Sequence, residues 1–499
     1  MNLLDDPVFT VETSTGHEMC SLPRIYALLC DDAVELFAKL QAHQKQAWHC
    51  FLAQLGAIAT ENRDLPETES GWREALAALT VPEAWNLYTE DLSKPAFMQP
   101  PVPEETLDGW DSIDVTSYDI PSLAKNHGIK KHRNIEPQAE HWVYMLTNVQ
   151  TSDTYGGSGH PKSSRGMQGR CFLTTTSSLR HGRWILYDIA RLHNYSSAIK
   201  DEYGYSEKGY TLLWTVPWGE SLAPDQLHPW YIDCCRRVRK DDQWLVTSTN
   251  DLRVEEPPNG ETGDAWAAVD RTKSVVLRPR DSTFRYDQLW AVLFSPDYLR
   301  PPGFSEIDKG YIVFRAMPKD FTERTSIRER ILPFSNLKRG WNKIERESKR
   351  RVQKAETAES IFSHALDWLL CEDANEGPNK DSKEHKKKVR KVKSRQKNAL
   401  HARIDQRFFD RLFEAPDMSD EERQTFWETI LVDALQTQMK EAMTLCPNKQ
   451  PWKRKAHAQS VFTGRMRHEF TYAKQHDTSY GTESNANDRN ADKPHHAAV

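Results

Sequence analysis

The chain has 499 residues, 38% of them hydrophobic and 28% charged, with a formal net charge of −5. This length exceeds what one hydrophobic core supports, so we expect two or three domains, and the hydrophobic content excludes global disorder. The overall charge does not indicate a nucleic-acid-binding protein, so any basic surface must be local. The eight cysteines lack zinc-finger spacing, and no signal peptide or membrane-length apolar run occurs. We therefore expect a soluble, cytoplasmic protein with free thiols.

The N-terminal part of the sequence contains three predicted helices, the first of which starts at Ser21-Leu22-Pro23. In residues 43–59, Trp48, Phe51 and Leu55 belong to an apolar set at three- and four-residue steps, which predicts a strongly amphipathic helix. The proline-rich segment 95–103 interrupts helical structure. Apolar residues from Trp142 to Val149 again fit one face of a helix.

The rest of the sequence changes from mixed to helical. Residues 205–335 contain short candidate strands such as YTLLWTV, QWLVTST, KSVVLR and YIVFRA, closely separated by prolines and glycines. Beyond residue 350 four amphipathic stretches follow, the third opening on a capping-box pattern of Ser419 and Glu422. We predict an α+β chain with a large mixed N-terminal domain (1–350), a C-terminal antiparallel four-helix bundle (351–475) and a disordered tail (476–499).

Residues 146–170, LTNVQTSDTYGGSGHPKSSRGMQGR, hold five of the 22 glycines. A polar, basic and glycine-dense segment is costly to bury. It is therefore either a mobile connection or a backbone surface that contacts a partner closely.

The first two helices of the predicted bundle are joined by a basic segment. Residues 380–397 carry ten Lys or Arg and two acidic residues, a net charge of +8, which leaves −13 for the rest of the chain. We predict a mobile basic linker at residues 373–399. A solvated linker and a contact to a phosphate backbone are compatible interpretations.

No catalytic constellation stands out in the sequence. The GGSGHPKSS segment lacks the Gly-Lys-Ser/Thr order of a nucleotide-binding P-loop, and Pro161 removes an N–H that a phosphate cradle needs. Cys234 has basic neighbours that could lower its pKa, but a packed thiol is the more common case. We predict a protein that is not an enzyme, with no cofactor and no metal. The alternatives are a stand-alone nuclease and a purely structural scaffold.

A series of motifs resembles the CasA family, the large subunit of the type I-E CRISPR Cascade complex. The resembling segments are MNLLDDP, SLPRIYALL, HQKQAWHCFLAQL, PAFMQPPVP, AKNHG, LTNVQTSDTYGGSGH, CCRRVR, GDAWAAVD and SIRER, in this order along the chain. The resemblance covers roughly residues 1–475. It implies recognition of the protospacer-adjacent motif in double-stranded DNA, help in unwinding the target and recruitment of a separate helicase-nuclease. Its implied partners are crRNA and the other Cascade subunits.

The resemblance also implies particular contact residues. A glycine loop that enters the DNA minor groove falls on Tyr155, Gly156, Gly157, Ser158, Gly159 and His160, where glycines let backbone atoms reach base edges. A basic finger falls near Arg237, Arg239 and Lys240, and an exposed basic strand is its alternative. A loop that docks on crRNA or neighbouring subunits falls on Lys125, Asn126 and His127, with a merely solvated loop as its alternative.

Two further elements complete the expected interface. The family's strand-separating wedge usually presents a glutamine, but the matching positions here are Glu323, Arg324 and Thr325. Arg324 could replace the glutamine by stacking its guanidinium on a base. In the basic segment, we expect Lys386, Lys387, Lys388, Arg390 and Lys391 to make nonspecific contacts to the phosphate backbone.

Overall fold

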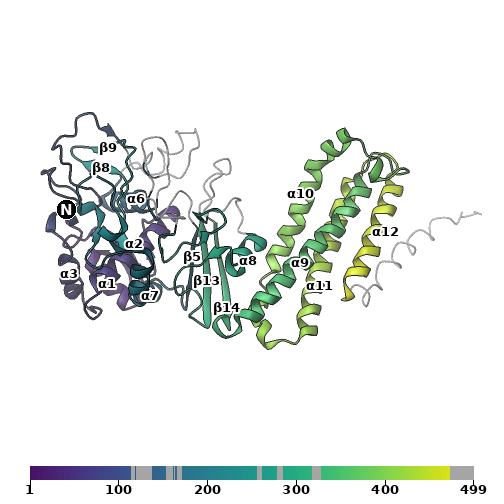
Figure 1. Cartoon of the computed structure of the whole chain (residues 1–499), viewed down its shortest axis with the longest axis horizontal. Coiled ribbons are helices and arrows are strands. Elements are labelled where there is room, and N and C mark those ends of the chain that lie inside the picture. The colour runs from purple at the N-terminus through teal and green to yellow at the C-terminus, as the bar shows by residue number, and fades with distance from the viewer. Residues whose placement is uncertain are drawn as a thin grey trace, which may run out of the picture. The chain divides into compact units, whose positions relative to one another are not determined.

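The structure is a computed structural model, and it describes residues 1–113, 119, 137–152, 161, 163–165, 171–255, 261–277, 285–316 and 328–472. The chain divides into two compact units (Figure 1). The first unit comprises Met1–Phe284 and Ala291–Lys338, and the second comprises Arg285–Trp290 and Arg339–Val499. Helices and strands mix in the first unit and helices dominate the described part of the second, so the predicted α+β class is confirmed.

Helices and short strands are interspersed in the first unit. The helices are α1 (Leu22–Cys30), α2 (Lys45–Ala59), α3 (Glu69–Ala77), α6 (Ala139–Thr151) and α7 (His181–Tyr203), while α8 (Tyr286–Phe294) crosses the boundary between the units. The strands are β1 (Phe9–Thr13), β2 (Gly16–Cys20), β3 (Leu36–Phe37), β4 (Asp111–Ser112), β5 (Phe172–Thr176), β6 (Tyr210–Leu212), β7 (Leu227–Ile232), β8 (Arg237–Lys240), β9 (Trp244–Thr247), β10 (Val269–Asp270), β11 (Val275–Val276), β12 (Tyr298–Leu299), β13 (Lys309–Ala316) and β14 (Arg328–Ser335). They form small sheets in the orders β2-β1-β3, β4-β9-β8, β14-β13-β5, β11-β10-β12 and β6-β7.

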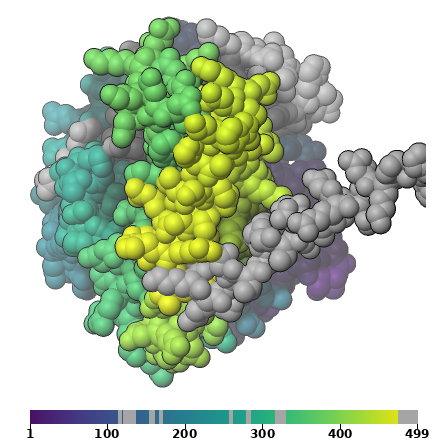
Figure 2. All heavy atoms as spheres, turned by 90° about the vertical axis from the view of Figure 1, so that its right-hand side faces the viewer, coloured from purple at the N-terminus to yellow at the C-terminus, as the bar shows by residue number. Residues whose placement is uncertain are grey.

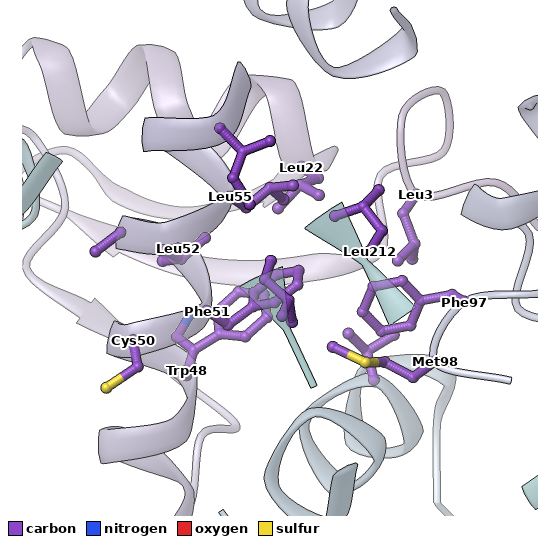
Figure 3. Packing of buried hydrophobic residues seen from close by; sticks show 14 of the residues in the cluster. Leu3, Leu22, Trp48, Cys50, Phe51, Leu52, Leu55, Phe97, Met98 and Leu212 are labelled. Atoms are coloured by element: carbon purple, nitrogen blue, oxygen red, sulfur yellow. The ribbon is translucent and has the colours of Figure 1, made fainter. Parts of the chain in front are cut away.

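The core of the first unit surrounds α2 (Figure 3). Trp48 stacks on Phe51 with ring centroids 5.3 Å apart, and the Tyr26 hydroxyl donates to the Leu52 carbonyl at 2.7 Å. The predicted amphipathic helix is present, but it is buried on nearly every side, including the polar side chain of His49. That burial is tolerated because His49 Nε2 lies 2.7 Å from a carboxylate oxygen of the buried Asp188.

Predicted helix starts are confirmed at both ends of the chain. The Ser21 hydroxyl caps α1 by accepting from the Arg24 N–H at 3.3 Å. In the second unit, Ser419 and Glu422 form the predicted capping box at the start of α11 (Asp420–Ala442). Each cap satisfies an N–H that the first helical turn leaves without an intrahelical partner.

The sheet β14-β13-β5 brings together segments that are far apart in sequence. Both neighbours of β13 run antiparallel to it. The register pairs Phe172 of β5 with Arg315, and it pairs Ala316, the last residue of β13, with Arg328. The start of β5, the end of β13 and the start of β14 therefore meet at one end of the sheet.

Four long helices in the described part of the second unit run antiparallel to their neighbours (Figure 1). They are α9 (Leu337–Leu370), α10 (Lys383–Arg407), α11 and α12 (Pro451–Glu469), and α12 lies along the face shown in Figure 2. Among the apolar positions of the four predicted helices, Phe426 is half-buried. The others are buried: Phe362, Ala365, Leu366, Leu369, Leu400, Ile404, Phe408, Leu412, Ile430, Ala434, Met439, Phe462, Met466 and Phe470. None of the helices in the described ranges is long and apolar enough to cross a membrane.

The prediction of a mobile basic linker at residues 373–399 is wrong for most of its length, because α10 is helical from Lys383 onward. Ser382 caps the helix by accepting from the His385 N–H at 3.2 Å, and lysine and arginine have good helix propensity. Lys393 pairs with Asp367, and Lys397 pairs with Glu359 at 2.9 Å. These carboxylates belong to α9, so pairing across the two helices offsets part of the repulsion within α10.

Candidate nucleic-acid interface

Three groups of predicted contact residues lie outside the described residues. They are the glycine loop (Tyr155, Gly156, Gly157, Ser158, Gly159 and His160), the docking loop (Lys125, Asn126 and His127) and the wedge positions (Glu323, Arg324 and Thr325). The described residues that flank them show where each of these segments is attached to the first unit.

Asp119 holds the segment of the docking loop to α6. Its buried carboxylate accepts from the Asn148 side-chain amide at 2.6 Å and from the Gln44 side-chain amide. His43 Nε2 lies 3.1 Å from the same carboxylate. Because Asn148 lies near the C-terminal end of α6, this network attaches the segment to the last turns of that helix.

The glycine-rich segment is attached to the same helix end by Ser163. The Ser163 hydroxyl donates to the carbonyl of Thr151, the last residue of α6, at 2.8 Å. Ser164 donates to Asp233 through its backbone N–H at 2.7 Å and through its hydroxyl at 2.8 Å. Burial raises the pKa of Asp233, and the two Ser164 donors oppose that shift.

Arg165 completes this attachment from inside the protein. Its guanidinium carbon lies 4.0 Å from the centroid of the Tyr231 ring, and it donates to the Pro229 carbonyl. Ser163 and Arg165 are both buried, with at most 3% of their surface exposed. The expectation that residues 146–170 avoid burial is therefore wrong for this part, because carbonyl, carboxylate and aromatic partners replace water around it.

The glycine-rich segment and the wedge segment reach the same end of one sheet. Residues 166–170 lead into β5, while residues 317–327 connect β13 to β14. Phe172 of β5 is the register partner of Arg315, which lies two residues before the wedge segment begins. Antiparallel partners have Cα atoms about 5 Å apart. The sheet therefore brings the bases of two predicted DNA-contacting segments side by side.

Arg239 of the predicted basic finger is an internal residue. It is fully buried on β8, and its guanidinium donates to the carbonyls of Gln99, Pro100, Asp91 and Lys94 at 2.9 to 3.4 Å. Burial lowers its pKa to about 10. This side chain ties β8 to the proline-rich segment and is not exposed for contact with DNA.

The other two finger residues lie nearer the surface, and both have partners. Arg237 pairs with Glu104 at 3.0 Å and lies over the Trp110 ring at 5.3 Å. The Lys240 ammonium donates to the carbonyls that follow β8, including that of Asp242 at 2.8 Å. The pattern CCRRVRK thus includes cations that support the fold, which the residue types alone do not reveal.

The basic residues of α10 form the largest group of predicted contacts within the described residues. Lys386, Lys387, Lys388, Arg390 and Lys391 are all exposed on this helix. In the part of the chain that the structure describes, none of them has an acidic partner within 4.0 Å. Their charges are therefore available to an anionic ligand.

Sequence analysis missed the residues that hold the loops. Asp119, Ser164 and Asp233 are short polar residues with no distinctive spacing, and their partners lie up to 76 residues away. A basic residue within a glycine-rich segment, such as Arg165, is indistinguishable by type from a surface cation. No signal in a single sequence identifies them.

Solved structures that match the chain over most of its length are CRISPR-associated proteins. Cse1 from Acidimicrobium ferrooxidans is 13% identical, covering 95% of this chain and 98% of its own, with a TM-score of 0.64. CasA from Thermus thermophilus is 13% identical, with 94% and 99% covered and a TM-score of 0.63. A chain of a CRISPR RNA-guided surveillance complex is 12% identical, with 94% and 99% covered and a TM-score of 0.53.

Sequence comparisons add nothing to this result, since no protein-family model and no curated protein matches the chain. At identities of 12 to 13%, the likeness is one of fold, and it extends over both units. The fold that the motif series predicts is confirmed on this basis. The chain has the fold of the Cse1, or CasA, proteins.

Proposed function

We propose that the chain is the large subunit of an RNA-guided type I-E CRISPR Cascade complex that serves antiviral defence. In this role it recognises the protospacer-adjacent motif in double-stranded DNA, aids unwinding of the target and recruits the helicase-nuclease, without catalysing a reaction itself. Its partners are crRNA, the other Cascade subunits and target DNA, and the complex is cytoplasmic. The full-length likeness to CasA and to a chain of an RNA-guided surveillance complex supports this proposal.

The observation that carries the proposal is the arrangement of the segments in the first unit. The docking and glycine-rich segments are attached to α6 through Asn148 and Thr151, which lie within one helical turn. The strand ends that flank the glycine-rich and wedge segments meet at one end of the sheet β14-β13-β5. Segments that must act on one short stretch of DNA need such shared support.

In this proposal the glycine loop Tyr155–His160 reads the minor groove through backbone atoms, and Glu323, Arg324 and Thr325 act beside the motif. Arg237 and Lys240 remain candidates for contacts near the motif, whereas the buried Arg239 is left out. Lys125, Asn126 and His127 contact crRNA or neighbouring subunits. The basic residues of α10 hold the phosphate backbone without reading sequence.

The test adds side chains to the glycine loop in the reconstituted complex. Gly157→Val and Gly159→Val should abolish preference for the correct flanking motif while the complex still assembles, because the minor groove is only ~6 Å wide. Ser158→Ala, which adds no bulk, serves as the matched control. Unchanged motif preference in both valine variants would favour the scaffold alternative, and metal-dependent cleavage by the isolated chain would favour the nuclease.

A further inference from the structure

A groove of about 890 Å³ lies between α9 and α10, within the second unit. Its walls come from facing positions of the two helices, from residues 378–381 that join them, and from Arg285. A volume of this size is typical of ligand-binding pockets. Of the interface residues described above, Lys386 and Arg390 also line this groove.

The carboxylates of the groove are already paired. Asp367 binds Lys393, Glu359 binds Lys397 at 2.9 Å, and Asp381 accepts from the backbone N–H of Glu372 at 2.7 Å. Each therefore offers little charge to a ligand.

Two cations of the groove remain unpaired. Lys386 and Arg390 line it from α10, one helical turn apart, and neither has an acidic partner among the described residues. Arg285, by contrast, is bound to Asp287. The charge that the groove presents to a ligand is therefore positive, which favours an anion.

The groove also offers hydrogen-bonding groups and an aromatic ring. Ser363, Ser394 and Asn398 line it, and their side chains have no hydrogen-bond partner in the described part of the chain. The Trp368 ring lines it too and is held by stacking on His457 at 4.9 Å. Amide and hydroxyl groups beside an aromatic ring suit the edges and faces of nucleobases.

A row of exposed cations continues from the groove along α10. Lys383, Lys387, Lys391 and Arg395 follow each other at four-residue steps, and no carboxylate among the described residues pairs with them. At 1.5 Å per residue, neighbours in this row are about 6 Å apart along the helix axis. A nucleic-acid strand that enters the groove can thus keep its phosphates on a continuous basic surface.

We propose that this groove binds single-stranded nucleic acid, with unpaired bases against Trp368, Ser363 and Ser394 and with phosphates on Lys386 and Arg390. A duplex cannot make these base contacts, because its base edges are paired and its rings are stacked on one another. The row along α10 binds the phosphates of either form. The inference goes beyond recognition of a flanking motif and does not depend on the glycine loop.

The test measures the affinity of the full-length chain for labelled oligo(dT), oligo(rU) and a duplex of equal length by fluorescence anisotropy. Ser394→Trp fills the groove and should weaken single-strand binding about tenfold, with less than about a twofold effect on the duplex. Lys386→Ala combined with Arg390→Ala should weaken single-strand binding by a similar factor. Thermal melts monitored by circular dichroism verify that both variants remain folded.

The matched control is Ala402→Trp, which adds the same ring to an exposed position of α10 that does not line the groove. It should leave all affinities unchanged. The proposal is overturned if Ser394→Trp affects single strands and duplex equally, if it affects neither, or if a polyglutamate peptide competes as well as an oligonucleotide. A stronger effect on oligo(dT) identifies DNA as the ligand, and a stronger effect on oligo(rU) identifies RNA. Because these probes carry no flanking motif, the inference can fail while motif recognition stands.

Discussion

Buried polar residues determine where the candidate loops begin. Asp119 and Asp233 are buried, and each accepts at least two hydrogen bonds. Such networks stabilise only when every member is satisfied, because each buried group left without a partner costs about 1–3 kcal/mol. They hold the ends of the candidate segments in place, as the proposed joint contact of those segments with one ligand requires.

Replacing Asp119 with Ala should therefore destabilise the first unit by about 2 kcal/mol, because the Asn148 and Gln44 amides lose their acceptor. Urea unfolding followed by tryptophan fluorescence measures the change in the free energy of unfolding. The control is Asp111→Ala, an exposed carboxylate on β4 that should cost less than about 0.5 kcal/mol. Equal effects of the two substitutions would show that the network contributes nothing.

A second residue makes stability depend on pH. His181 begins α7 and packs edge-on against Phe37, with ring centroids 5.5 Å apart. Burial lowers its pKa from 6.5 to about 4, with the nearby charges of His49 and Arg315 adding to the shift. The unfolded chain therefore binds this proton first, so the stabilisation present above pH 6.5 is lost as the pH falls toward 4.

His181→Phe keeps the aromatic packing and removes the titration. It should reduce the loss of stability between pH 7 and pH 5 by up to about 2 kcal/mol. Urea unfolding at both pH values measures the difference. An unaltered pH profile in His181→Phe would contradict the assignment.

At the scale of elements, sequence patterns predicted helices and strands well where apolar spacing determines them. The helix starts at Ser21 and Ser419 follow from local residues alone. The prediction of a mobile linker in the basic segment was wrong because the carboxylates that support α10, such as Asp367, lie on another helix. The prediction that Arg239 contacts DNA was wrong because the carbonyl groups that bind its side chain come from a segment about 140 residues earlier.

The sheet that joins the glycine-rich and wedge segments depends on a close backbone approach at Gly310. A Cβ atom at this position of β13 would lie 2.2 Å from the Thr176 carbonyl oxygen of β5. Gly310→Ala should therefore lower the stability of the first unit by about 1–3 kcal/mol, because the two strands must move apart. Thermal unfolding measures the effect. The control is Gly219→Ala, where the added methyl group meets no atom within 4 Å and no loss is expected.

In the proposed function, helix α10 contributes affinity without sequence specificity. Changing Lys386, Lys387, Lys388, Arg390 and Lys391 to Gln should weaken binding to all duplexes alike. The slope of log affinity against log salt should flatten by about 0.9 for each phosphate that the helix no longer neutralises. Replacing the four lysines with Arg retains the charge and should retain affinity. A loss confined to duplexes with the correct flanking motif would contradict this role.

At the scale of the whole molecule, the two units differ in architecture, and we propose a different role for each. The first unit carries the segments expected to read and open the duplex, and the second carries the exposed basic helix and its groove. The order of motifs along the sequence predicted this fold although overall identity to the solved structures is only 12 to 13%. The arrangement of segments could not be predicted in the same way, because it depends on partners such as Asp119 and on the register of β13.

The proposed role of this chain is recognition of the flanking motif for an RNA-guided complex. The most direct measurement compares target binding by the reconstituted complex with and without the chain, on duplexes that carry matched or scrambled flanking motifs. We expect the complete complex to prefer the matched motif by about tenfold or more, and the complex without the chain to lose that preference, since each base pair that is no longer read costs about 1–3 kcal/mol. Unchanged discrimination in the absence of the chain would contradict the claim.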